Sequence, residues 1–423
     1  MISKISQIWR ARDLRKNIIF VLLMLAIFRF AAHIPIPNVN VDALRDLFSS
    51  SQILGLLNIF SGGGMQNFSI VMMGIAPYIT ASIIFQLLAM VIPALEEMQK
   101  EEAGRQKINM WTRWATVPLA ALQSISMITL LRRSSYEILG DVSSFDLFSM
   151  VVVITAGTVF LMWLGELISE KNIGNGISLL IFAGIVSSLP QAIQQTVVTY
   201  DSSKLFTIIS FIAISIITII GVVFINEGQR KIPIQHARQI RGNRSYGGTA
   251  THLPLRVNMA GVIPIIFAIA LVTFPATIAQ FFRNARTEWI ASFSEWVIEI
   301  LNNQLIYGLS YFALVFAFTY FYTEVIFHPD RIAENLQRQG AFIPGIRPGS
   351  NTRDYLAYTV HRIVFVGALF LAVIAILPLI MRYFTGTQSL AIGGTSLLIV
   401  VSVVIETVKQ IESQLTMREY ESK

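Results

Sequence analysis

The sequence contains no cysteine among its 423 residues. Disulfide bonds, thiol catalysis, zinc–thiolate sites and iron–sulfur clusters are therefore excluded. Histidine is also scarce, and the five histidines lie far apart along the sequence, so no cluster predicts a metal or haem site. We expect neither a metal centre nor a cofactor.

Charged residues are scarce as well. They make up 13% of the chain, against roughly 25% in ordinary soluble domains. Hydrophobic residues make up 54%, and the mean hydropathy is +0.62. A soluble globule of this length cannot bury so much apolar surface, and a disordered chain needs the opposite composition. The composition therefore predicts a protein whose main solvent is lipid.

Ten apolar stretches are candidates for membrane-spanning helices, which need roughly 20 mostly apolar residues. The first follows several basic residues, as the apolar core of a signal peptide does. A second span comes after it, so we expect a retained helix. The ten stretches lie at about 17–32, 70–92, 114–131, 148–168, 177–193, 205–225, 257–278, 305–327, 356–379 and 389–408.

An even number of crossings places both termini on the same side of the membrane. The segments on that side, with the ends of the spans that border them, carry 24 of the 32 Lys and Arg residues, whereas the opposite segments carry seven. Positively charged segments of membrane proteins face the cytoplasm. We therefore expect both termini to be cytoplasmic.

Arg29, Glu166, Glu324 and Glu406 are ionisable residues within the predicted spans. Such residues are functional candidates by default. The three glutamates fall at predicted cytoplasmic ends, and Arg29 lies near the outer end, from which its long side chain can reach the surface. We interpret all four as structural. The lack of charge near the midplane argues against an ion-coupled transporter.

The apolar stretch at 53–60 is too short to span a membrane, and Ser61 and three glycines follow it. Its length is typical of a re-entrant or interfacial segment. Irregular backbone at membrane depth is tolerated only where it is buried in protein or lines a water-filled cavity. The spacing leaves two interpretations open: a short segment that dips in from outside as a stopper, or an amphipathic loop on the outer surface.

The second span combines polar and aliphatic stripes around Pro77. At helical spacing Ser82 and Gln86 share one face, while Ile79 and Ile83 share another. One stripe is suited to line a cavity and the other to meet a neighbouring helix, but the same residues also fit simple helix packing. The seventh span has a similar character, with Asn258, Gly261 and Pro264.

Two predicted cytoplasmic loops, at about 226–256 and 328–355, are basic. Such segments bind anionic lipid, RNA phosphates or an acidic protein, and composition does not choose among them. Neither loop is long enough for a catalytic domain, and the chain has no GxxxxGK[ST] phosphate loop. Their basic residues are Arg230, Lys231, Arg238, Arg241, Arg244 and Arg256, then Arg331, Arg338, Arg347 and Arg353.

Five long runs occur in order along the chain: GIAPYITASIIFQLL (74–88), FLMWLGELISEKNIGNGISLLIFAGIVSSLP (160–190), THLPLRVNMAGVIPIIFA (251–268), FIPGIRPG (342–349) and GGTSLLIVVSVVIE (393–406). They resemble the SecY family of protein-conducting channels, which includes the eukaryotic translocon alpha subunit. The bacterial type fits best. The resemblance covers essentially the whole chain, from IPIPN (34–38) to the C-terminal tail.

The resemblance implies an all-α polytopic membrane protein. Ten helices would form two pseudo-symmetric, inverted five-helix halves, residues 1–193 and 194–423, around an hourglass pore. Such a channel passes unfolded secretory polypeptides across the membrane and releases transmembrane segments sideways into lipid. It is not an enzyme, and a partner motor or the ribosome drives it.

Site residues follow from the motif positions of the family. The implied pore ring is Ile79, Ile83, Ile185, Ile266 and Ile399. The implied plug is about 57–67, that is Leu57, Asn58, Ile59, Phe60, Ser61, Gly62, Gly63, Gly64, Met65, Gln66 and Asn67. The implied lateral gate sets Thr80, Ser82 and Gln86 against Asn258 and Gly261. The implied docking residues are Arg230, Arg238, Arg241, Arg244 and Arg347.

Residues 242–244 depart from the family pattern, since Gly242-Asn243-Arg244 stands where a paired basic dipeptide follows glycine. The implied partners are small SecE-type and SecG-type membrane subunits, the SecA ATPase motor, the ribosome, signal peptides, nascent membrane proteins and the lipid bilayer. The implied location is the bacterial plasma membrane.

Two other function classes remain for comparison. A secondary transporter also uses inverted repeats and broken helices, but it predicts saturable uptake of a small solute and midplane charges. An intramembrane enzyme needs a catalytic dyad, and no Ser/His pair or pair of aspartates lies within the predicted spans. The sequence therefore favours the channel.

Overall fold

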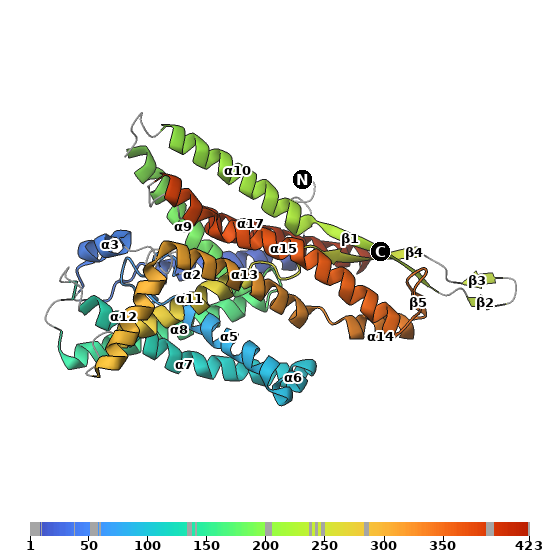
Figure 1. Cartoon of the computed structure of the whole chain (residues 1–423), viewed down its shortest axis with the longest axis horizontal. Coiled ribbons are helices and arrows are strands. Elements are labelled where there is room, and N and C mark those ends of the chain that lie inside the picture. Colours follow the sequence, from blue (N-terminus) through green and yellow to red (C-terminus); the bar gives the residue numbers. More distant parts are fainter. Residues whose placement is uncertain are drawn as a thin grey trace.

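The computed structural model describes residues 9–421 except 10, 38, 51–57, 59–60, 133–137, 140–141, 199–204, 237–238, 242–243, 247–249, 283–286 and 386–392. Long helices dominate the described part, and they run back and forth along one direction (Figure 1). The first group is α2 (Arg12–Ala31), α3 (Val41–Ser50), α5 (Ala76–Val91), α6 (Pro93–Lys100), α7 (Glu102–Arg132), α8 (Ser144–Ser169) and α9 (Gly176–Val198).

The second group follows in the rest of the chain. Its helices are α10 (Leu205–Glu227), α11 (Ile263–Phe282), α12 (Glu288–Asn302), α13 (Gln304–Ile326), α14 (Pro329–Arg338), α15 (Ser350–Thr385) and α17 (Gly393–Glu421). Its strands are β1 (Gln229–His236), β2 (Gln239–Arg241), β3 (Arg244–Tyr246), β4 (Ala250–Arg256) and β5 (Ala341–Phe342).

Each of the ten predicted spans overlaps one helix of this series. Among the described residues, five helices are long and apolar enough to cross a membrane by length and composition, or six if the bent pair α5–α6 is counted as one span. Gly176–Pro190 in α9 and Ile263–Ala276 in α11 are shorter apolar segments. The chain is therefore a multi-pass membrane protein with a helical fold.

Two predicted spans begin too early. Residues 70–75 form turns, and α5 begins only at Ala76, where Pro77 occupies the first helical turn. A proline there costs no hydrogen bond, because the first N–H groups of a helix have no partner inside it. Residues 257–262 likewise precede α11 in irregular backbone that includes Gly261 at a φ of +64°. The sequence prediction included these turns in the helices because their residues are apolar.

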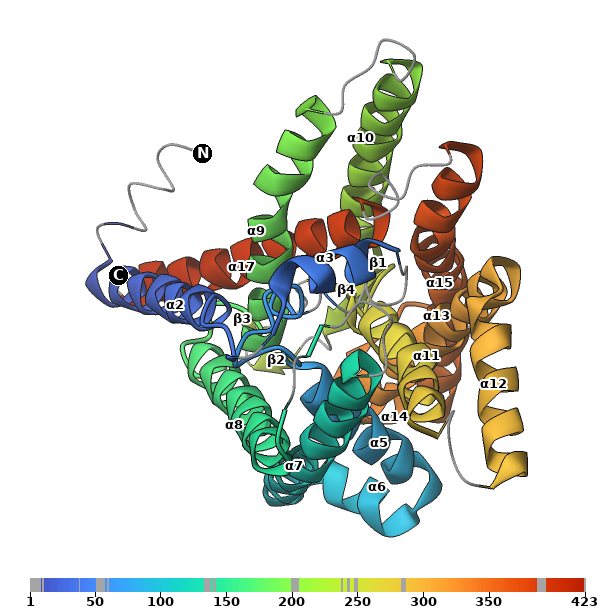
Figure 2. The ribbon, with the colours of Figure 1, turned by 90° about the vertical axis from the view of Figure 1, so that its left-hand side faces the viewer.

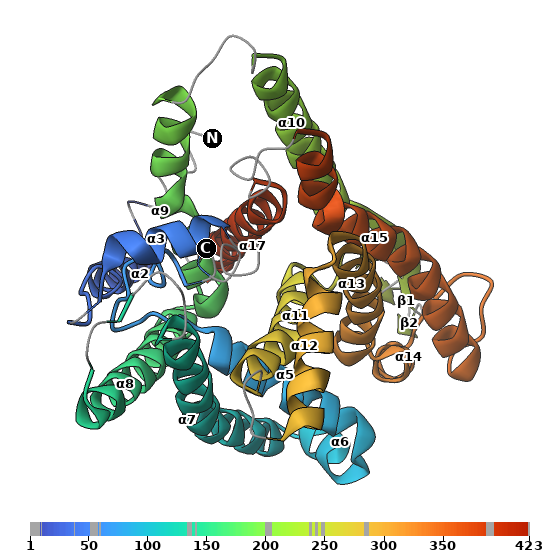
Figure 3. The same cartoon turned by 60° about the vertical axis from the view of Figure 1, so that its left-hand side comes forward.

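The helices pack in two groups of five. α5 packs against α7, α7 against α8, and α8 against α9, with α2 in contact with both α8 and α9. In the second group α13 packs against α11 and α15, and α17 against α10 and α15. The groups meet where α11 contacts α5 and α7, and where α17 contacts α9 (Figure 3). The fold thus has two halves joined along two seams.

The two ends of the bundle differ. The β1–β4 hairpin extends from one end, beside α14 and α6, whereas α3 and α12 lie at the other end (Figure 1). We call these the hairpin end and the opposite end. From the opposite end, Figure 2 shows the blue segment between α3 and α5 in the middle of the surrounding helices.

The hairpin joins the two predicted basic loops into one unit, which the sequence did not predict. β1 pairs with β4 along its length, and β5 adds to the other edge of β1 through Gln235 opposite Phe342 and His236 opposite Ala341. Ile232 and Leu255 from the hairpin pack with Ile343 and with Leu356 of α15 in one buried cluster. The resulting sheet is fixed to the helices beneath it.

α12 is a second element that the sequence did not predict. Its exposed aromatic residues, Trp289, Phe293 and Trp296, repeat at helical spacing along one face, and the rings of Phe293 and Trp296 stack. Glu288, Glu295 and Glu299 fall on another face. An amphipathic helix of 15 residues is too short to span a membrane, so the search for long apolar runs missed it.

Candidate functional site: a constriction, a plug segment and two seams

The five isoleucines of the predicted ring lie in one hydrophobic cluster. Ile79 and Ile83 come from α5, Ile185 from α9, Ile266 from α11 and Ile399 from α17, and each is at most 7% exposed. The first three belong to one half and the last two to the other. The five residues therefore share one large buried cluster that spans both halves, together with many other apolar side chains.

An aliphatic constriction has definite chemical properties. Isoleucine side chains offer no hydrogen-bond donor or acceptor, so they do not hold any particular sequence of polar groups. A ring of such side chains also gates by expelling water when it is empty. All five of the isoleucines that the resemblance assigns to the ring are buried in this structure.

The predicted plug is described in part. Leu57, Ile59 and Phe60 lie outside the described residues, whereas Asn58 is described as helical and residues 61–67 form turns. Ser61 is 1% exposed and Met65 is 2% exposed. This burial favours the segment that dips into the protein over the loop on the outer surface.

Internal hydrogen bonds give the plug segment its shape. The Ser61 hydroxyl donates to the Asn58 carbonyl at 2.9 Å and accepts from the N–H of Met65 at 3.1 Å. The Asn58 side-chain oxygen accepts from the N–H of Gln66 at 3.0 Å. Gly62 and Gly63 have φ angles of +68° and +80°, which glycine adopts without strain. The polar side chains thus supply the hydrogen bonds of a compact irregular turn, and the glycines supply its unusual backbone angles.

Arg29 contacts the plug segment, which the sequence did not predict. Its guanidinium Nη1 donates to the Gly62 carbonyl, across 33 positions of sequence. The prediction that Arg29 merely reaches the surface is therefore wrong, since its side chain turns inward to a backbone oxygen. Nothing in the spacing of Arg29 and Gly62 signals this contact.

The predicted gate residues lie on α5 and just before α11, two elements that pack together. Their hydrogen bonds stay within the half that carries them. The Thr80 hydroxyl donates to the Ala76 carbonyl, and the Gln86 amide donates to the Ser82 hydroxyl. The hydrogen bonds of Asn258 run to its own turn and to α10. The polar groups of α5 and of this turn thus do not pair with each other.

Asn258 belongs to a polar chain inside the second half. Its amide donates to the side-chain oxygen of Asn226 at 2.7 Å, and the Asn226 amide donates to the Ser402 hydroxyl at 2.7 Å. Asn258 also caps its own turn, because its side-chain oxygen accepts from the N–H of Gly261. These bonds tie the start of α11 to α10 and α17. The sequence pointed to Asn258 but not to its partners.

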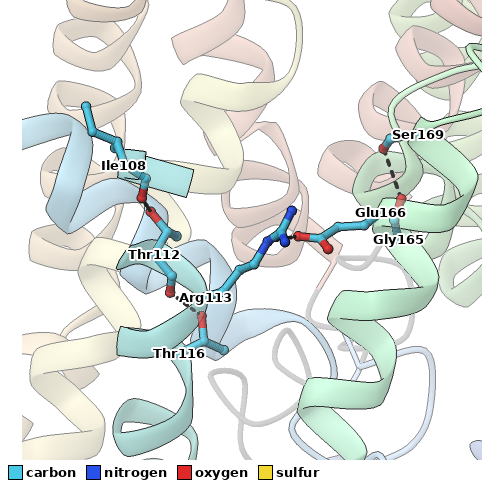
Figure 4. Close-up of polar contacts among 7 residues, drawn as sticks. All are labelled: Ile108, Thr112, Arg113, Thr116, Gly165, Glu166 and Ser169. Carbon is cyan, nitrogen blue, oxygen red and sulfur yellow. Dashed lines mark hydrogen bonds and ion pairs between the residues drawn. The ribbon is translucent and has the colours of Figure 1, made fainter. Parts of the chain in front are cut away.

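Glu166 pairs with an arginine of the neighbouring helix, a partner that the sequence did not indicate. Arg113 of α7 and Glu166 of α8 form an ion pair at 2.6 Å (Figure 4). The hydroxyls of Thr112, Thr116 and Ser169 next to this pair donate to carbonyls one turn back in their own helices (Figure 4). The pair joins two helices of the first half.

The docking arginines are described unequally. Arg230 is exposed on β1, and Arg347 is exposed in a turn flanked by Gly345 and Gly349, whose φ angles are +82° and +100°. The Thr352 hydroxyl donates to the Arg347 carbonyl at 2.9 Å and fixes this turn. Arg241 and Arg244 are opposite each other in the β2–β3 pair, whereas Arg238 lies outside the described residues.

Comparisons with known proteins point to one family. A family model described as SecY matches residues 69–408. The chain is 46% identical to the protein translocase subunit SecY of Bacillus subtilis over 432 residues, and 45% identical to that of Halalkalibacterium halodurans over 431 residues. Each alignment covers 99% of this chain and 99% of the relative.

Solved structures share the fold. The structure of a protein-conducting channel superposes with a TM-score of 0.62 at 17% identity and covers 93% of this chain and 91% of that one. A structure concerned with the plug domain of the SecY protein, which stabilises the closed state, gives a TM-score of 0.60 at 18% identity with the same coverage. Sec61 in a canine ribosome–channel complex gives 0.57 at 16% identity and covers 93% of this chain and 91% of that one.

Proposed function

Because the chain belongs to the SecY family, we propose how its described residues carry out the family's task. The protein is a protein-conducting channel subunit and not an enzyme. It passes unfolded secretory polypeptides across the membrane and releases transmembrane segments into lipid. Its partners are SecE-type and SecG-type subunits, the SecA motor, and the ribosome.

The cluster of Ile79, Ile83, Ile185, Ile266 and Ile399 is the pore ring in this proposal. One observation carries it: aliphatic side chains from four helices and both halves converge in a single buried cluster. A passage for arbitrary polypeptides must bind no sequence strongly and must exclude water when it is empty. Isoleucine meets both conditions, because it lacks hydrogen-bonding groups and favours dewetting.

The proposed plug is 57–67, and the predicted division of the halves separates 1–193 from 194–423. The predicted boundary at residue 193 lies inside α9, which ends at Val198, so we draw the boundary between the halves at the end of this helix instead. Residues 61–67 form turns, so a movement of this part of the plug breaks no helical hydrogen-bond ladder. The burial of Ser61 and Met65, and the close fit of Gly62 between Phe28 of α2 and Gly184 of α9, support a seated position.

The proposed lateral gate is the seam between α5 and α11, with Thr80, Ser82 and Gln86 on one side and Asn258 and Gly261 on the other. The hydrogen bonds of Thr80, Gln86 and Asn258 lie within their own halves, whereas the buried side-chain oxygen of Gln86 has no hydrogen-bond partner among the described residues. Separation of the two helices therefore breaks none of these bonds. An apolar segment of a passing chain gains free energy in lipid, whereas contacts between such helices average under about 1 kcal/mol each.

The proposed docking surface combines the two basic loops. Arg230 on β1 and Arg347 near β5 belong to connected segments, because β5 pairs with β1. The remaining docking residues are Arg238, Arg241 and Arg244. A fixed sheet presents exposed arginines to RNA phosphates or to acidic groups of a motor with little loss of entropy on binding.

The proposed membrane is the bacterial plasma membrane, with both termini in the cytoplasm. Support comes from the excess of Lys and Arg on the terminal side and from the bacterial relatives. In this orientation the hairpin end is cytoplasmic, and α3, α12 and the plug segment lie toward the outer side.

A photo-crosslinking experiment tests the proposed pore. A photoreactive residue replaces Ile83, Ile185, Ile266 or Ile399, one at a time, in channels that hold a stalled secretory precursor. We expect adducts with the precursor at all four positions. Ile84, which is exposed on the outer face of α5, is the matched control and should give lipid adducts. If none of the four ring positions gives a precursor adduct, the proposal is contradicted.

A further inference from the structure

Arg29 lies inside a membrane-spanning helix and has no carboxylate partner among the residues that the structure describes. Its side chain is partly buried near the end of α2, and its guanidinium donates to the Gly62 carbonyl. An arginine inside a membrane is costly to keep, and residues of this kind usually serve a function. An arginine that only reached the membrane surface would not need a hydrogen bond to a backbone carbonyl inside the protein.

Gly62 fits closely between two helices at the point where Arg29 binds it. A side chain at this position would come within 2.7 Å of the Phe28 ring and within 3.0 Å of the Gly184 backbone in α9. Gly62 also has a φ of +68°, which side chains rarely adopt. The backbone at Gly62 is thus enclosed by α2 and α9 and is accessible to a hydrogen-bond donor from α2.

The two ends of this segment are attached in different ways. At its C-terminal end, backbone hydrogen bonds join the N–H of Ile36 to the Phe68 carbonyl and the N–H of Ile70 to the Ile34 carbonyl. At Gly62, the attachment to α2 is a hydrogen bond from one side chain. Paired backbone bonds form a fixed anchor, whereas a single side chain releases its acceptor by rotating about its own bonds.

We propose that Arg29 is a latch that holds the plug segment in its seated position through the Gly62 carbonyl. This inference rests on the proposed assignment of 57–67 as the plug. The segment turns about its anchor at 68–70 when the channel opens, and the Arg29–Gly62 bond breaks. Arg29 is a positioning residue in this scheme and does not contact the passing polypeptide in the closed channel.

The chemistry of arginine suits a latch. A hydrogen bond from a charged donor is about twice as strong as a neutral one, so a single contact biases the seated position. The bond requires no particular side chain on the plug, because the group that accepts it is a backbone carbonyl. One such bond is also weak enough for a passing polypeptide to displace.

A cysteine probe measures the position of the segment. The chain has no cysteine, so Met65→Cys places a single thiol in the plug segment at a site that is 2% exposed. The rate of labelling by a membrane-impermeant maleimide, added from the outer side, then reports how often the segment leaves its seat. The measurement uses the full chain with its membrane subunits, reconstituted in vesicles without precursor.

The variant Arg29→Gln removes the charge of the latch. We expect labelling of the thiol to become about tenfold faster, which corresponds to about 1.4 kcal/mol. Arg29→Lys keeps a charged donor and should stay within about threefold of the parent, because a charged donor supplies most of the bond. Arg132→Gln is the control: it removes an exposed arginine from the C-terminal end of α7 and should leave the labelling rate unchanged.

Two results would overturn the latch. One is an unchanged labelling rate in Arg29→Gln. The other is an equal acceleration in Arg29→Gln and Arg29→Lys, which indicates lost packing rather than a lost charged bond. Intact thermal unfolding of the variants in detergent shows that they are folded, so that faster labelling is not the result of unfolding.

A stalled precursor separates this proposal from the one on which it rests. If precursor fails to accelerate labelling of the Met65→Cys thiol in the parent channel, the segment is not a plug and the proposed function fails there. If precursor accelerates labelling but Arg29→Gln does not change the resting rate, the plug assignment stands and the latch alone fails.

Discussion

The two seams between the halves differ in how they are held. Where α5 meets α11, the polar residues Thr80, Gln86 and Asn258 form hydrogen bonds within their own halves. Where α17 meets α9, the Gln414 amide donates to the Asn172 carbonyl, which lies in the turn before α9, at 2.7 Å. A hydrogen bond therefore crosses the second seam, whereas the named polar groups of the first seam do not pair across it.

This difference suggests which seam opens. Apolar contacts have no preferred direction, so two helices joined by them can slide or separate without leaving a polar group unpaired. A hydrogen bond to a backbone carbonyl fixes one relative position and is worth roughly 0.5–1.5 kcal/mol. We infer that the α5–α11 seam opens while the α9–α17 seam acts as the hinge.

Polar ties within each half support the same division. The first half has the Arg113–Glu166 ion pair, and the second half has an ion pair between Lys409 and Glu227 at 2.8 Å. The Asn226–Asn258 chain adds a tie within the second half. Each half is thus suited to move as a unit about the hinge.

The largest expected effect is a block of export when the α5–α11 seam is locked. Cysteines at Ser82 and Asn258 are joined by a bifunctional reagent in this cysteine-free chain. Opening then requires a covalent bond to break, so secretion of a reporter precursor should stop and recover after the link is cleaved. A link that forms with no loss of secretion means that this seam does not open.

The matched control locks the other seam. Asn172 and Gln414 are close enough for a short link, because the Gln414 amide nitrogen lies 2.7 Å from the Asn172 carbonyl oxygen. Linking cysteines at these two positions should leave secretion near the parent level. Equal loss in both locked channels would remove the distinction between gate and hinge.

The next largest effect concerns the isoleucine cluster that both seams share. Ile83→Ser with Ile185→Ser should raise resting ion conductance, because a serine attracts water into the constriction. Loss of about 1.4 kcal/mol, the scale of two buried methylene groups, changes the wetted population about tenfold. Planar-bilayer recording measures this effect. Ile84→Ser on the exposed face of α5 should change nothing, and equal leakage there argues against the ring.

A smaller effect is expected at the docking surface. Arg347→Glu inverts a charge in a turn whose fold depends on Gly345, Gly349 and Thr352 rather than on the arginine side chain. An exposed charge pair is worth up to about 1 kcal/mol, so motor-driven secretion should fall about fivefold while the chain stays folded. Arg338→Glu on α14 is the control. A secretion rate in Arg347→Glu equal to that of the control excludes Arg347 from docking.

The smallest effect is expected at the hinge hydrogen bond. Gln414→Met keeps the length of the side chain and removes the donor to Asn172. Loss of this bond should lower the free energy of unfolding by about 0.5–1.5 kcal/mol, seen as a melting temperature about 2 °C lower in detergent. An unchanged melting temperature would mean that this bond contributes nothing to the hinge.

The sequence predicted the membrane helices well for a physical reason. A spanning helix must be apolar over most of its length, and that constraint is local, so hydropathy reveals it. The ring isoleucines came from the family resemblance, since an isoleucine in a pore and one in an ordinary helix contact look alike in sequence.

Contacts between distant residues could not be predicted in this way. Arg29 binds a backbone carbonyl, which every residue has, so no motif marks Gly62 as its partner. The pairing of β5 with β1 likewise depends on two loops folded together over about a hundred residues of sequence, and Pro233 inside β1 weakens any strand signal. Asn258 stood out in the sequence, but its bond to Asn226 depends on the packing of α10.

A distance measurement tests the difference between the seams most directly. One pair of spin labels replaces Leu88 on α5 and Ile263 on α11, and a second pair replaces Asn175 at the start of α9 and Ser413 on α17. Each distance is measured with and without a stalled precursor. We predict that the first distance lengthens with precursor while the second stays the same. A second distance that lengthens while the first stays fixed would contradict the account.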